Sequence, residues 1–92
     1  MKTHELRTWP VYFRAIQQGL KTFEARKDDR GFKEGDALLL REYDPEEDSL
    51  PPGERYTGRD LLVQVTYVLN GGHFGIEQGW CVMGFRRVEE GS

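Results

Sequence analysis

Residues 19–26 read Gly19-Leu20-Lys21-Thr22-Phe23-Glu24-Ala25-Arg26, and this stretch predicts a helix end, a tight turn and a strand. Gly19 is suited to end a helix because it adopts a left-handed backbone conformation without a steric penalty. In the strand that follows, apolar Phe23 and Ala25 alternate with polar residues. Alternate residues of a strand face opposite sides, so the polar side chains share one face.

Three charged side chains of this stretch, Lys21, Glu24 and Arg26, form the main candidate site. Lys21 or Arg26 would hold a phosphate, because ionised donors make the stronger and shorter hydrogen bonds. Glu24 would accept a hydrogen bond from a nucleobase amino group. The alternative is a surface ion pair between Glu24 and Arg26, which contributes only about 0–1 kcal/mol. Lys21 and Glu24 are also candidate catalytic residues, since burial or Arg26 would depress the pKa of a nucleophilic lysine.

The residues before this stretch predict a short strand and then a helix. Leu6–Trp9 is the predicted strand, with Leu6 inward and Arg7 outward. Pro10 suits the first helical turn, where its missing N–H has no cost. The helix runs to Gly19, and one apolar stripe is expected at helical spacing: Trp9, Tyr12, Phe13, Ile16 and Leu20.

The residues after it predict further strands separated by turns. Strands are expected at Ala37–Tyr43, Leu61–Leu69 and Trp80–Arg87. In the long middle strand, Leu61, Val63, Val65 and Tyr67 are expected to share one face. Turns are expected at 28–31, 35–36 and 70–72, and residues 44–56 form a proline-containing acidic loop that reads as an insertion. One helix with several short strands indicates a mainly β (α+β) fold, a small barrel of five to six strands.

The chain of 92 residues is expected to form a single domain over residues 1–92, with a tail that frays from Glu89. A chain of this length holds one modest core. That core is expected to be largely aromatic, built from Trp9, Tyr12, Phe13, Phe23, Phe32, Tyr43, Tyr67, Phe74, Trp80 and Phe85.

The net charge of −3 is concentrated in the acidic loop. Five acids and one base give that loop a charge of −4, so the rest of the chain carries +1 and can present a basic face. The single cysteine, Cys81, lies in an apolar run and is expected to be a buried structural thiol. Without an apolar leader or a membrane-length apolar run, a cytoplasmic protein with no membrane contact is expected.

Two further features are weighed as parts of a site. His73 lies between glycines in a loop where the backbone can approach a ligand, and it is a candidate to close over one; Phe74 and Trp80 are expected to be core residues before aromatic platforms. Arg26, Lys27, Arg30 and Lys33 form a basic cluster that would track a phosphate backbone, or else a solvated turn. His4, His73 and Cys81 show no ligand spacing, so no metal and no cofactor are expected.

The 19–26 stretch fits the G-x-K-x-x-E-x-R signature of the ASCH domain (activating signal cointegrator homology). Gly35-Asp36 before a leucine-rich strand and the closing Val82-Met83-Gly84-Phe85 also fit. The chain resembles a small prokaryotic and phage ASCH-like family of unknown function, whose members carry residues similar to His4-Glu5-Leu6, Trp9-Pro10 and Gly71-Gly72-His73-Phe74-Gly75.

This resemblance implies a fold like that of the PUA superfamily (pseudouridine synthase and archaeosine transglycosylase), which is associated with RNA and modified nucleosides. It implies an RNA or nucleotide ligand held by Lys21, Glu24, Arg26 and His73. Some similar proteins are amidohydrolases on acetylated cytidine, and they use the signature Lys with a Thr and a distant Glu. Lys21 matches, but Glu24 stands where those enzymes have Thr, a departure that counts against hydrolysis. A third interpretation is a protein-interaction module that uses the acidic loop.

Overall fold

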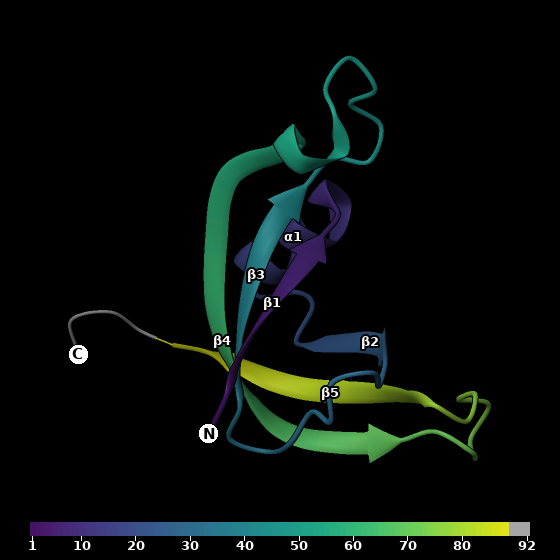
Figure 1. The fold of residues 1–92 in the computed structure, drawn as a ribbon. Coiled ribbons are helices and arrows are strands. Elements are labelled where there is room, and N and C mark those ends of the chain that lie inside the picture. The colour runs from purple at the N-terminus through teal and green to yellow at the C-terminus, as the bar shows by residue number, and fades with distance from the viewer. Residues whose placement is uncertain (89–92) are drawn as a thin grey trace.

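The computed structural model describes residues 1–88, so the tail predicted to fray from Glu89 lies outside the described residues. The elements are β1 (Thr3–Thr8), α1 (Pro10–Gln17), β2 (Phe23–Lys27), β3 (Ala37–Tyr43), the 3-10 helix η1 (Pro52–Glu54), β4 (Tyr56–Asn70) and β5 (Trp80–Arg87). The strands form one sheet in the order β1-β3-β4-β5-β2. The prediction of a mainly β fold with five strands and one N-terminal helix is confirmed. The sheet curls into a half-barrel, with β1 and β2 at its two edges (Figure 1).

Strand β4 makes the sheet curl because its two halves pair with different neighbours. It pairs antiparallel with β3 from Tyr56 to Gln64 and with β5 from Val63 to Asn70. A register shift between Val65 and Tyr67 marks a bulge, which bends a strand and increases its twist. Figure 1 shows β4 curving from β3 round to β5. The prediction that Tyr67 shares a face with the buried Val63 and Val65 is wrong, because the bulge interrupts the alternation and leaves Tyr67 exposed.

Helix α1 begins at Pro10, as expected, and ends at Gln17. Gly19 takes the left-handed conformation with φ 78°. The backbone N–H groups of Leu20 and Lys21 both donate to the carbonyl of Ala15, at 2.9 and 3.1 Å. This closed turn leads the chain from the helix directly into β2 and fixes where Lys21 lies.

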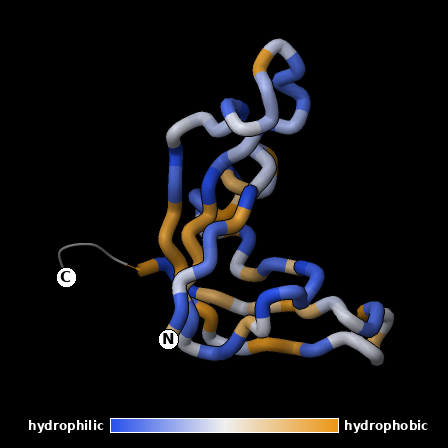
Figure 2. Tube along the Cα trace, in the orientation of Figure 1, coloured by the Kyte–Doolittle hydropathy of each residue, from blue (hydrophilic) through white to orange (hydrophobic). Residues whose placement is uncertain are grey.

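The hydrophobic core is more aliphatic than aromatic. Its buried cluster consists of Leu6, Ile16, Phe32, Leu38, Leu40, Val63, Val65, Cys81, Met83 and Phe85. Figure 2 shows hydrophobic segments gathered where β1, β3 and β4 run side by side. Burial raises the pKa of the Cys81 thiol, and the charge of Asp28 adds to that rise. The prediction of a buried cysteine is confirmed.

The prediction of a largely aromatic core is wrong. Six of the ten aromatic residues assigned to it are exposed: Trp9, Tyr12, Phe23, Tyr67, Phe74 and Trp80. The predicted helical stripe fails in the same way, since only Phe13 and Ile16 of its five members are buried. A helix of eight residues presents little more than two turns to the sheet, so the flanking aromatic residues stay at the surface.

Several element boundaries differ from the expected ones. Strand β1 begins at Thr3 rather than Leu6, and β4 begins at Tyr56, so the acidic loop spans residues 44–55. The expected bounds of β3 and β5 are confirmed, as is the burial of Leu6 with Arg7 exposed. No helix within residues 1–88 is both long and apolar enough to span a membrane.

Candidate functional site

A cleft of about 710 Å³ lies between the two edge strands of the half-barrel. Its walls come from β1 and β2, and the start of α1, the α1–β2 turn, the β2–β3 loop and Trp80 of β5 complete it. The two edges are not hydrogen-bonded to each other within the described residues, because the sheet order places them at opposite ends. The cleft is therefore a direct consequence of a sheet that curls without closing.

A carboxylate held by two cations lies in this cleft. Glu24 is only 5% exposed, and it accepts hydrogen bonds from Lys21 Nζ at 2.7 Å and from Arg26 Nε at 2.9 Å. The strand alternation turns Glu24 inward while Phe23 stays exposed. The polar face of β2 is thus its inner face. Lys21, Glu24 and Arg26 form one cluster with a net charge of +1.

Lys21 is fixed by more than its ion pair. Its ammonium also donates to the carbonyl of Phe23 at 2.7 Å. It lies 5.4 Å from the ring centre of Tyr12 and 5.0 Å from that of Phe23, within the range of cation–π attraction. An ammonium has three N–H donors, and two are used here, so one is left for a ligand.

Two arginine side chains connect the edge strands across the cleft. Arg26 donates through Nη2 to the backbone carbonyl of Arg7, and Arg30 donates through Nη1 to that of Glu5 at 2.7 Å. Both acceptors belong to β1, whose outer edge faces no other strand. Guanidinium groups thus satisfy edge carbonyls that another chain would otherwise pair with. Arg7 itself lines the cleft, but its guanidinium donates to the hydroxyl of Tyr56, which is outside the cleft.

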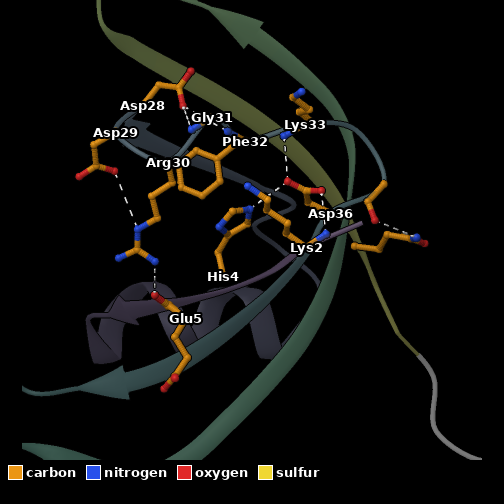
Figure 3. Close-up of polar contacts among 12 residues, drawn as sticks. Lys2, His4, Glu5, Asp28, Asp29, Arg30, Gly31, Phe32, Lys33 and Asp36 are labelled. Carbon is orange, nitrogen blue, oxygen red and sulfur yellow. Dashed lines mark hydrogen bonds and ion pairs between the residues drawn. The ribbon is translucent and has the colours of Figure 1, made fainter.

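The loop that carries Arg30 is held by two aspartates, as Figure 3 shows. Asp28 accepts from the backbone N–H groups of residues 31 and 32 at 3.1 and 3.2 Å. Asp36 accepts from His4 Nε2 at 2.9 Å and from the N–H groups of residues 2 and 33. Burial by itself would raise the pKa of Asp36, but these hydrogen bonds outweigh burial and lower the pKa below its ordinary value. The loop is therefore tied to β1 at the side of the cleft.

Four of the exposed aromatic side chains line the cleft: Trp9, Tyr12, Phe23 and Trp80. The rings of Trp9 and Tyr12 are stacked, with centroids 6.0 Å apart and an interplanar angle of 22°. Sequence reasoning missed them as site residues because a helical stripe of aromatic residues is usually core. A useful signal was the closeness of Trp9 to Pro10, which places that side chain at the very start of the helix.

Thr8 was also missed, and nothing in the sequence distinguishes it. It is the last residue of β1, lines the cleft and is buried. Among the described residues its hydroxyl has no hydrogen-bond partner.

The structure brings Lys21, Glu24 and Arg26 together, but it places His73 elsewhere. His73 is exposed in the β4–β5 connection, where its ring contacts Phe74 edge-to-face at 4.7 Å, and it is not among the cleft residues. The predicted core position of Phe74 is wrong, since that ring is exposed. Of the predicted basic cluster, Arg26, Lys27 and Arg30 line the cleft and Lys33 does not. Within residues 1–88, no three His, Cys, Asp or Glu side chains are grouped as metal ligands.

Comparison with known protein families matches residues 3–85 to a family described as a domain of unknown function, DUF3850. No curated protein matches the chain. The match includes every strand as far as Phe85 of β5, and with them all the residues that line the cleft. The chain therefore belongs to the DUF3850 family.

Proposed function

We propose that this protein binds single-stranded RNA, or a nucleotide-sized part of it, in the cleft between β1 and β2. One observation carries the proposal: cationic and exposed aromatic side chains occur together along one concave surface. Proteins that bind single strands combine positive charge along the backbone path with rings on which bases stack. The ASCH signature at residues 19–26 supports the same ligand class, and we assign the chain to the PUA-like superfamily on that resemblance.

The charge of the cleft supports an anionic ligand. Four cationic side chains are placed to act there (Lys21, Arg26, Lys27 and Arg30), against Glu24 and Asp29. The cleft is thus positive in a chain whose net charge is −3. Lys27 and Arg30 are the exposed members and would contact phosphates, while Glu24 would accept from a base amino group through a remaining lone pair.

Both tryptophans of the chain line the cleft, which makes their fluorescence a direct reporter of binding. Titration of the native protein with a single-stranded RNA pentamer at low salt is expected to change that fluorescence saturably. Lys27→Ala is expected to weaken binding without altering stability, because no ion pair holds the Lys27 side chain among residues 1–88. Lys33→Ala is the matched control, an exposed lysine of the same loop region outside the cleft.

Loss of one phosphate contact reduces the steepness with which affinity falls with salt by about one unit. This change is expected for Lys27→Ala and not for Lys33→Ala. Equal binding and equal salt dependence of the two variants would contradict the proposed ligand path, and absence of binding by the native protein would contradict the function.

The contact of Lys21 Nζ with Glu24 at 2.7 Å favours one second candidate, an amidohydrolase for N-acylated nucleosides. A lysine paired with a carboxylate in a cleft is a suitable general acid–base arrangement. Incubation with acetylcytidine and related N-acylated nucleosides tests it. Turnover that is absent in Lys21→Ala would establish the enzyme, and no turnover across the panel would leave the binding function alone.

A further inference from the structure

We propose that the Thr8 hydroxyl is a hydrogen-bonding group for the base of the bound ligand and that it determines which base the cleft prefers. This inference rests on the nucleotide binding proposed above. It assigns the recognition of the base to a residue outside the charged cluster.

Thr8 differs from every other buried polar side chain in residues 1–88. The others are His4, Glu24, Asp36 and Glu42, and each has a partner: His4 with Asp36, Glu24 with two cations, and Glu42 with the Thr57 hydroxyl at 2.6 Å. Thr8 is 2% exposed, and its Oγ1 has no partner within those residues. Its register neighbour on β3 is Glu42, whose carboxylate is already engaged by Thr57.

A buried hydroxyl without a partner is unfavourable for folding, because it has lost its hydrogen bonds to water. Valine has nearly the same shape and would fill this position without that loss. Local violations of this kind are expected at functional sites, where the missing partner belongs to a ligand. Since Thr8 lines the cleft, a group that enters the cleft can reach its side of the wall.

The surroundings of Thr8 fit a base better than a phosphate. Its chain neighbour Trp9 stacks with Tyr12 at the cleft, so a base lying on these rings presents its edge to the wall. A hydroxyl both donates and accepts, and it matches the carbonyl or amino group of such an edge. Phosphates are better matched by the exposed Lys27 and Arg30. The inferred ligand is therefore a nucleotide whose base is buried and whose phosphate stays at the rim.

Thr8→Val and Thr8→Ser separate this role from a structural one. Thr8→Val is expected to raise the Tm of the free protein by about 2–8 °C, since it removes an unpaired buried hydroxyl. It is expected to weaken binding of the preferred RNA pentamer about 3- to 15-fold, the effect of one lost hydrogen bond. Thr8→Ser keeps the hydroxyl and is expected to bind within about twofold of the native protein.

Thr57→Val is the matched control, because it makes the same chemical change at a hydroxyl that does have a partner. It removes a hydrogen bond to buried Glu42, so the Tm is expected to fall while RNA binding is unchanged. The sign of the Tm change thus distinguishes a hydroxyl kept for a ligand from one kept for the fold.

The experiment titrates pentamers of adenylate, cytidylate and uridylate into the native protein and the three variants, with tryptophan fluorescence as the readout and the Tm measured without RNA. Thr8→Val is expected to change the order of preference among the pentamers, whereas Lys27→Ala weakens all three alike. Native affinity and preference in Thr8→Val, or a fall in its Tm, would overturn the role of Thr8 and leave RNA binding in place. No binding of any pentamer by the native protein would overturn both.

Discussion

Glu24 is the residue on which the charged part of the cleft depends. Its carboxylate is nearly buried, and each oxygen accepts one hydrogen bond, from Lys21 and from Arg26. A buried carboxylate that loses one partner is left with an uncompensated charge. The two cations are therefore structural partners of Glu24 as well as candidate ligand contacts.

Removal of one cation tests this dependence. Lys21→Ala is expected to lower the free energy of unfolding by about 1.5–3 kcal/mol, the range for a hydrogen bond to a charged group. Urea denaturation of Lys21→Ala, Glu24→Ala and the double variant measures it. The double variant is expected to be more stable than the two single effects would give together, by about 0.5–3 kcal/mol. Additive effects would show that the contact does not stabilise the fold.

Asp36 gives the loop beside the cleft a dependence on pH. Because its hydrogen bonds lower the pKa of the folded protein below the ordinary 3.8, its contribution to stability is complete above that pH. The contribution is lost as the pH falls through the folded-state pKa. Asp36→Asn is expected to lower the Tm near neutral pH and to lose less on acidification. Thermal unfolding of both proteins between about pH 2 and pH 7 checks this, and a constant difference in Tm would contradict it.

The sequence predicts the convergence of Lys21, Glu24 and Arg26 because the spacing is local. A helix-ending glycine and strand alternation are enough to place all three together. It does not predict that their face is the inner one, since a period of two is the same for either side of a strand. Exposed Trp9 and Trp80 and the unpartnered Thr8 depend on contacts between distant segments, and no local pattern contains them.

At the scale of elements, β4 shows how far patterns reach. Its strand character is evident from alternating apolar residues. The bulge between Val65 and Tyr67 is not, and it is this irregularity that lets one strand pair with β3 and then with β5. The number of strands was therefore predictable, whereas the half-open shape that creates the cleft was not.

The acidic loop is expected to be dispensable for the fold. Its ends are already joined, since the N–H of Asp44 donates to the carbonyl of Arg55 at 2.9 Å, and the ring of Tyr43 contacts that of Tyr56 at 5.1 Å. We predict that replacing residues 45–54 by Asn-Gly, a two-residue hairpin turn, changes the Tm by only a few degrees. Thermal unfolding checks the exchange.

The same replacement distinguishes binding in the cleft from binding through the loop. It removes negative charge, so RNA affinity at low salt is expected to be kept or raised. A variant that unfolds would contradict the dispensable loop. A folded variant that has lost RNA binding would show that the loop, and not the cleft alone, forms the site.

At the scale of the whole molecule, charge is separated in space. The acidic loop projects beyond α1 and the ends of β1 and β3, while the positive cleft lies between β1 and β2 (Figure 1). A net charge of −3 therefore says little about the ligand, because steering depends on the local field. The open edges of the half-barrel, connected by arginine side chains, give that field a concave surface on which to act.

The most direct test of this account is to map the RNA contact on the native protein. Backbone and indole N–H signals are followed by two-dimensional NMR during titration with a single-stranded RNA pentamer at low salt. The account predicts that the largest shifts occur in residues 6–9, in residues 21–30 and in the indole signals of Trp9 and Trp80. Shifts concentrated instead around His73 or in the acidic loop would contradict it.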